Sequence, residues 1–120
     1  MAIVLSGTGI QFTTGPEQQK AASSFVLGFA QTWQNMLSPT VQRATQVTYT
    51  NFTGRPIMVF IRMTDSGSNA CVFMIDGVNV ATTSHNGGNA GAQVQCIIPT
   101  GSTYRVDSGS WPMNGWYELR

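Results

Sequence analysis

The chain has 120 residues, of which only 9% are charged, and its formal net charge is +1. Such a length suits one domain with a substantial core, and the lack of a basic stripe argues against a nucleic-acid-binding protein. Lys, Glu and Arg normally cover the exposed face of a helix, so their scarcity beside abundant Thr, Ser, Asn, Gln and Gly favours an all-β fold. A surface this poor in charge resists association only weakly, and we expect copies of the chain to cover part of it.

The N-terminal stretch is not expected to be a targeting signal. Residues 1–6 lack the length and basic start of a signal peptide, and no apolar run approaches the ~20 residues of a membrane span. We therefore expect a protein made in the cytoplasm without membrane insertion. Residues 2–13 predict two short strands around Gly7-Thr-Gly9. A lone hairpin is unstable in water, so this arm must pack on the main domain, on a neighbouring copy or on another protein.

Residues 1–22 are predicted to form this arm and its linker, and residues 23–120 the main domain. Residues 25–37 are ambiguous. Phe25, Phe29 and Trp33 fall at helical spacing, whereas the internal Gly28 and the polar composition favour a strand. The pattern alone leaves both alternatives open.

From residue 46 onward the sequence predicts six or seven short strands. Val47 and Tyr49 alternate with polar residues, turn residues follow, and the apolar run 57–61 suits a strand covered on both faces. Asp76-Gly77 between apolar runs is the preferred pair for a type I′ hairpin. Further strands are expected at 94–98, 104–107 and 116–119. This spacing predicts an antiparallel β-sandwich with a jelly-roll-like arrangement.

No catalytic constellation is present in the sequence. Gly-x-Ser-x-Gly is absent, and His85, the only histidine, lies in a glycine-rich stretch that would hold a catalytic group poorly. The five carboxylates show no pairing typical of glycoside cleavage. We expect no enzyme activity, no cofactor and no metal. Cys71 and Cys96 lie in apolar runs and are interpreted as buried thiols, with a disulfide between neighbouring strands left open.

The aromatic residues divide into two groups. Three are predicted to lie in the core: Trp33, Phe60 and Phe73. Four others are candidates for a sugar-stacking face: Tyr104, Trp111, Trp116 and Tyr117. The alternative for this second group is that the rings close the end of the sandwich or pack between subunits.

Several segments stand in the order found in one known family: Gln31–Asn35, Tyr49–Ile57, Val72–Val80, Ile97–Tyr104 and Trp116–Arg120. They resemble the C-terminal β-domain of bacteriophage tail-fibre and tail proteins. The resemblance covers residues 29–120. Gly9-Ile-Gln-Phe12 with Gly15 and Gln18 also resembles the opening of short phage fibre proteins, although Thr14 stands where Asp usually precedes that glycine.

The resemblance implies a virion structural protein, commonly a homotrimer at the distal end of a fibre, in which Gln31 to Met36 form a strand. It supplies no catalytic residue. It suggests a short tail fibre or receptor-binding protein, whose arm attaches to other virion proteins or joins the trimer. Host-surface glycan would meet two loops, and the candidate residues are Asp65, Ser68, Asn69, His85, Asn86 and Asn89.

Two other functions remain open at this point. One is a capsid decoration (cement) protein, or a baseplate or tail component, with no receptor. The other is a free lectin-like carbohydrate-binding module, which would leave the arm unexplained.

Overall fold

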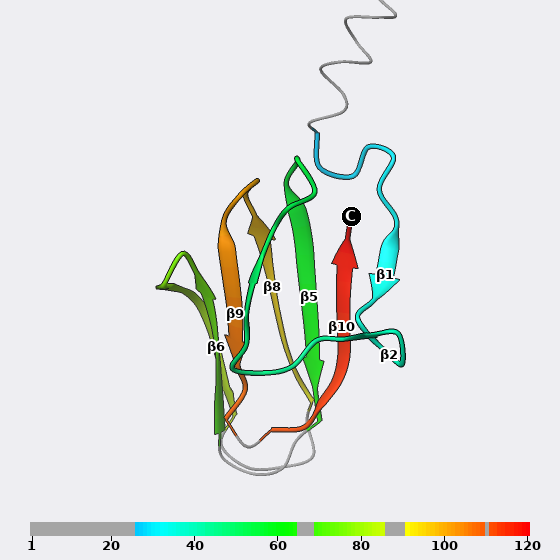
Figure 1. The fold of residues 1–120 in the computed structure, drawn as a ribbon. Helices are drawn as coiled ribbons and strands as arrows, with labels where there is room; N and C mark the ends of the chain where they lie inside the picture. Colours follow the sequence, from blue (N-terminus) through cyan, green and yellow to red (C-terminus); the bar gives the residue numbers. More distant parts are fainter. Residues whose placement is uncertain (1–25, 65–68, 86–90, 110) are drawn as a thin grey trace, which may run out of the picture.

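The computed structural model describes residues 26–64, 69–85, 91–109 and 111–120 (Figure 1). The predicted arm and linker, residues 1–22, lie outside the described residues. The described part contains no helix, and its strands are β1 (Trp33–Asn35), β2 (Leu37–Ser38), β3 (Val41–Gln42), β4 (Thr48–Thr50), β5 (Ile57–Met63), β6 (Asn69–Ile75), β7 (Val78–His85), β8 (Ala92–Ile98), β9 (Thr103–Asp107) and β10 (Met113–Leu119). The all-β prediction is therefore confirmed, as are the strands expected from residue 46 onward.

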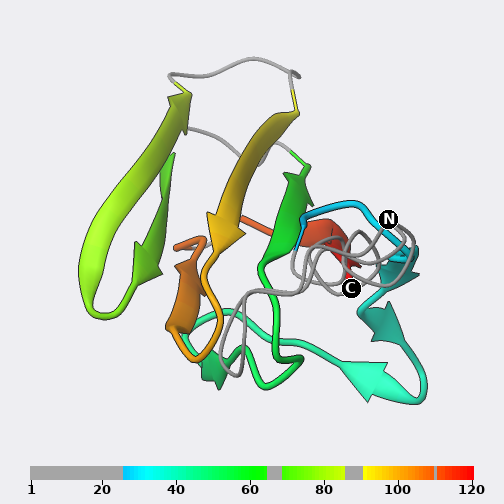
Figure 2. The same ribbon diagram turned by 90° about the horizontal axis from the view of Figure 1, so that it is seen from above.

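The strands form two four-stranded antiparallel sheets and one small ladder. Sheet I has the order β1-β10-β5-β8, and sheet II has the order β4-β9-β6-β7. Among the described strands, the short β2 and β3 pair only with each other. Figure 2 shows the strands of both sheets from above. Consecutive strands therefore often lie in different sheets, and β4 and β5, which flank one turn, are an example.

One apolar core lies between the two sheets. The odd-numbered residues of β5, from Ile57 to Met63, are buried, and so are Phe73 and Val106 of sheet II. This period-2 burial is what a strand with one covered face requires. Met58 and Phe60 are only half-buried, so the prediction that the run 57–61 is covered on both faces is wrong. The outer face of β5 is open.

The Asp76-Gly77 turn has the predicted type I′ geometry. Asp76 has φ 51° and Gly77 has φ 78°, the two left-handed conformations that this turn needs. The Asp76 carboxylate accepts hydrogen bonds from Thr103 N and Ser102 Oγ, each at 2.8 Å. These bonds, that of the Thr103 backbone foremost, lower the pKa of Asp76. The turn residue thus also fastens the hairpin to β9.

Residues 26–38 contain turns and short strands, so the helical alternative is wrong. Gly28 and Ala30 have positive φ, which a helix excludes. The strand implied for Gln31 to Met36 holds for β1. Thr32 and Arg120 exchange backbone hydrogen bonds of 3.1 and 3.2 Å, which extend the pairing of β1 with β10. Pairing with a distant strand outweighs the local helical spacing here.

The described chain has two distinct ends (Figure 1). The arm end holds Val26–Ala30, the turns before β5 and after β8, and the C-terminal Arg120. The loop end holds Met63, Ala92 and Met113, which are register partners, together with the Asn69–His85 pair. The predicted host-contact segments therefore begin and end at the opposite end from Val26.

Candidate functional site

Two rows of side chains cross the outer face of sheet I. Residues paired between antiparallel neighbours project on the same face. The register joins one apolar row across the four strands: Trp33, Leu119, Met58 and Ile97. A second row has an amide at each edge and two rings between them: Asn35, Tyr117, Phe60 and Gln95.

A hollow of about 300 Å³ lies on this face, lined by Trp33, Phe60, Gln95 and Tyr117. This is the lower end of the ~300–1,000 Å³ usual for small-molecule pockets. Trp33 is 52% exposed, Gln95 is exposed, and the two other rings are half-buried. No charged side chain lines the hollow. We call these four residues the aromatic hollow.

Gly115 helps to shape the aromatic hollow. A Cβ atom at this position would lie 2.9 Å from Tyr117 Cε2 and 3.3 Å from Arg62 Cβ. The first distance is too short for any real contact, so the Tyr117 ring occupies the space that a side chain here would fill. Gly115 also adjoins the register shift between Met113 and Gly115. The glycine therefore leaves room for the Tyr117 ring in the position that it occupies.

The core prediction for aromatic residues is right for Phe73, which is fully buried, and wrong for Trp33. Trp33 lies on β1, the edge strand of sheet I, and in the outward row. Phe60 is half-buried on the same face. Side chains alternate between the two faces of a strand, so one residue known to point into the core would have predicted that Trp33 and Phe60 point outward. The sequence does not reveal which residues of β1 and β5 are partners.

The sugar-stacking interpretation needs correction at Trp111 and Trp116. The two rings are 3% and 0% exposed, so neither offers a face to a saccharide. Trp116 pairs with Ile61, whose side chain points into the core. Tyr104 is also buried. Of the four candidates, only Tyr117 lies on an open face, and the other three pack in the core of the domain.

The buried carboxylate of Glu118 has four polar partners among the described residues. Tyr104 Oη donates to Oε1 at 2.7 Å and Trp116 Nε1 at 3.1 Å. Arg120 Nη1 lies 2.9 Å from Oε2, and Arg43 Nε lies 3.4 Å from Oε1, a charge contact rather than a hydrogen bond. Burial, then the charge of Glu118, raises the pKa of Tyr104. Glu118, Tyr104 and Trp116 are buried and the two arginines are partly exposed, so the cluster offers no cavity to a ligand and its role is to stabilise the fold.

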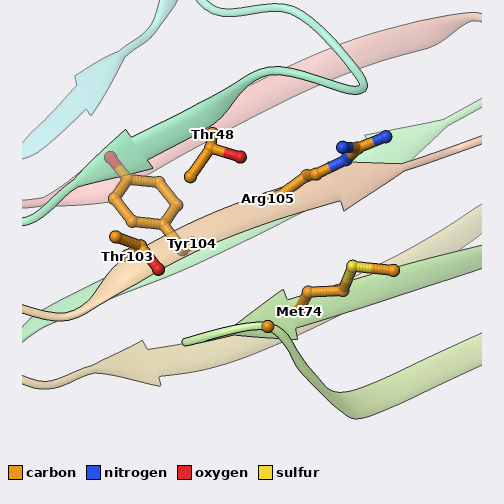
Figure 3. A pocket seen from close by; sticks show the side chains of 6 residues that line it. Thr48, Met74, Thr103, Tyr104 and Arg105 are labelled. Carbon is orange, nitrogen blue, oxygen red and sulfur yellow. The ribbon is translucent and has the colours of Figure 1, made fainter.

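A second, smaller hollow lies on sheet II (Figure 3). It has about 160 Å³ and is lined by Thr48, Met74, Gly77, Thr103, Tyr104 and Arg105. Arg105 Nε is buried and has no hydrogen-bond partner among the described residues. The carboxylate of Asp76, bonded to Thr103, lies beside this hollow. The volume is below the usual pocket range, so the aromatic hollow is the stronger candidate for a binding site.

Most of the predicted host-contact residues lie outside the described residues: Asp65, Ser68, Asn86 and Asn89. The backbones of Asn69 and His85 are described. Asn69 begins β6, His85 ends β7, and the two are register partners. These two positions are therefore strand ends rather than loop residues, and their pairing places the strand ends that border the two predicted loops at the same end of sheet II.

The two cysteines are free thiols. Cys71 is buried in sheet II and Cys96 is half-buried in sheet I. Burial foremost, then the charges of Asp107 and Cys96, raise the pKa of Cys71 to about 11. The interpretation as a buried thiol is confirmed for Cys71.

Within the described ranges, no group of three or more His, Cys, Asp or Glu side chains is placed to hold a metal ion. The same part of the chain has no helix long and apolar enough to cross a membrane. Comparison of the chain with protein-family models, with curated proteins and with solved structures found no match.

Proposed function

We propose that this chain is a structural protein of a bacteriophage virion, a short tail fibre or receptor-binding protein that contacts the host surface. In this proposal the domain is a jelly-roll-like sandwich and the protein is a homotrimer. The arm of residues 1–22 joins the trimer or attaches to other virion proteins. The opposite end meets the host.

The segments that carry the phage resemblance contain residues that stabilise the fold. Asn51 is buried, and its Nδ2 lies within 2.8–3.2 Å of the carbonyl oxygens of Arg55, Ile98 and Pro99. Arg55 donates to the carbonyls of Phe29 and Ala30 at 2.7 and 3.1 Å. One short motif thus ties three segments together at the arm end. A motif with this architectural role supports a likeness in fold.

The observation that best supports this function is that the arm and the two predicted loops join the domain at opposite ends. The chain enters the described domain at Val26, at the arm end, whereas the strand ends that bound residues 65–68 and 86–90 lie at the loop end. An attachment at one end and a contact surface at the other is the arrangement that an adhesive fibre tip needs. Gly, Ser and Asn in such loops suit polar contacts with a glycan.

Exposed apolar side chains at the arm end support attachment to a partner. Phe52 is 85% exposed, and Val26 and Phe29 are also exposed. Apolar side chains gathered at one end of a domain are typical of a surface that another protein covers. Both the trimer and the attachment to virion proteins draw on this observation.

Two experiments test the proposal. Light scattering on the purified full-length chain is expected to give the mass of a trimer, and a stable monomer would contradict the assembly. Antibody labelling of virions is expected to mark the tail, and the recombinant protein is expected to reduce phage adsorption. Hundreds of copies on the capsid, with no effect on adsorption, would instead favour the decoration function.

A further inference from the structure

We propose that the aromatic hollow binds a neutral saccharide ring, which stacks on Trp33 and Tyr117 and bonds to the Gln95 amide. This adds a second contact surface to the proposed function and rests on that function only for the source of the saccharide. The site lies on the flank of the domain, on sheet I, and not at the loop end.

The composition of the hollow matches the chemistry of a pyranose. A sugar ring has an apolar face of C–H groups and a rim of hydroxyls. Trp33, Tyr117 and Phe60 supply flat apolar surfaces, and the exposed Gln95 amide both donates and accepts hydrogen bonds. No charged group lines the hollow, so the preferred sugar is neutral.

The order of side chains along the row argues against a second copy of the chain as the occupant. The rings of Tyr117 and Phe60 are flanked by two exposed amides, Asn35 and Gln95. Asn35 Oδ1 already accepts a hydrogen bond from Leu37 N at 3.0 Å. A flat apolar contact across this row would bury the Gln95 amide and Asn35 Nδ2 without partners, which costs about 1–3 kcal/mol for each group. Sugar hydroxyls would instead satisfy them. The hollow itself would stay empty under a flat partner.

Trp33 provides a built-in reporter for the test. It is the exposed indole of the chain, at 52%, whereas Trp111 and Trp116 are 3% and 0% exposed. The fluorescence of the full-length protein is to be titrated with glucose, galactose, mannose, rhamnose, N-acetylglucosamine and N-acetylgalactosamine. We expect at least one of them to quench the emission and shift it to the blue. No response to any of the six would overturn the proposal.

Variants distinguish binding at the aromatic hollow from nonspecific binding to the protein surface. Saturation-transfer NMR with the responding sugar is expected to show binding that is weaker by about tenfold or more in Trp33→Ala and in Gln95→Ala. The matched control is Val47→Ala, which removes an exposed apolar side chain just before β4 of sheet II, away from the hollow, and is expected to bind as the wild type does. Equal binding by Trp33→Ala and the wild type contradicts the assignment. Because Trp33 is exposed, the Trp33→Ala variant is expected to have the same melting temperature as the wild type.

Other occupants give different results. If the Trp33 emission of the free protein shifts to the red on dilution, a second copy covers the hollow and the saccharide proposal fails. If deletion of residues 1–22 gives the same shift, the arm is the occupant and the proposal also fails. Adsorption assays distinguish the two proposals. A Trp33→Ala protein that binds no sugar but still blocks adsorption would show that the aromatic hollow is not needed for host contact, and the proposed function would still hold.

Discussion

At the scale of single residues, Glu118 shows how so weakly charged a chain uses a charge. Its buried carboxylate accepts from Tyr104 and Trp116 and contacts Arg43 and Arg120, so four partners compensate its desolvation. Arg43 also lies over the Tyr49 ring, 4.1 Å from its centre. The carboxylate thus joins the segment after β3 to the C-terminal end of β10.

The first prediction is that Glu118→Gln destabilises the protein by about 1–3 kcal/mol, because the buried donors of Tyr104 and Trp116 lose their charged acceptor. Urea unfolding of the variant and the wild type measures the difference. Asp107→Asn is the control, since Asp107 is only half-buried, and it is expected to change stability far less. Equal losses for the two variants would show that the Glu118 cluster is not special.

The second prediction concerns alkaline pH and Cys71. Its pKa is raised from 9.0 to about 11, so the folded state keeps the proton over a range in which the unfolded state releases it. The stabilisation from Cys71 is complete below pH 9 and declines as the pH rises to 11, by about 1–2 kcal/mol. Urea unfolding at a series of pH values tests this. Cys71→Val, which has no titrating group, is expected to show a shallower decline.

At the scale of elements, the Asp76-Gly77 hairpin and the register shift beside Gly115 in β10 require glycine for different reasons. Gly77 has φ 78° and open space around its Cα, whereas Gly115 has no positive φ but lies against the Tyr117 ring. The first is a requirement of the backbone and the second is a requirement of packing. The distinction gives two separate predictions.

The third prediction is that Gly77→Ala costs about 1 kcal/mol, because an alanine at this φ is strained even where there is room for it. Thermal unfolding measures the loss. Gly77→Asn, a residue that tolerates the left-handed region, is expected to recover most of it. A loss in Gly77→Asn as large as that in Gly77→Ala would contradict the backbone explanation.

The fourth prediction is that Gly115→Ala displaces the Tyr117 ring, with a cost of about 1–3 kcal/mol. The double variant Gly115→Ala with Tyr117→Ala is expected to be less destabilised than the sum of the two single variants, since the clash is then absent. Additive losses in this cycle would show that the ring does not meet the new methyl group.

The sequence predicts these elements unequally. The Asp76-Gly77 hairpin follows from two adjacent residues, so local pattern suffices. The Trp33 position depends on the pairing of β1 with β10, about 85 residues further along the chain. Local spacing favoured a helix there and the core for its ring. The aromatic hollow combines β1, β5, β8 and β10, so no single stretch of sequence contains its signal.

At the scale of the whole molecule, the strands run between two ends with different surfaces. Exposed Phe52 lies at the arm end, and the Asn69–His85 pair lies at the loop end. The composition predicted the fold class and a surface that associates readily. The sequence could not predict which segments lie at the arm end and which at the loop end, because this depends on which strand ends meet in space.

The fifth prediction follows from the proposed function: Phe52→Ser lowers the proposed attachment to the virion, or the proposed assembly as a trimer, without lowering stability. The ring is 85% exposed, so its removal creates no cavity. Light scattering and incorporation into virions measure the effect. Thr100→Ala, an exposed change in the turn between β8 and β9 at the same end, is the control. Unchanged mass and incorporation in Phe52→Ser would show that this ring is not part of an interface.

The order of sheet II has one further consequence, for β7. This strand lies at the margin of the sheet, and on its outer side no other described strand pairs with it. It is eight residues long and exposes Val78 and Val80. A long edge strand with apolar side chains, paired on one side only, is a template on which another extended chain can add. Concentrated preparations are therefore expected to polymerise through this margin, and Val80→Lys is expected to delay that polymerisation.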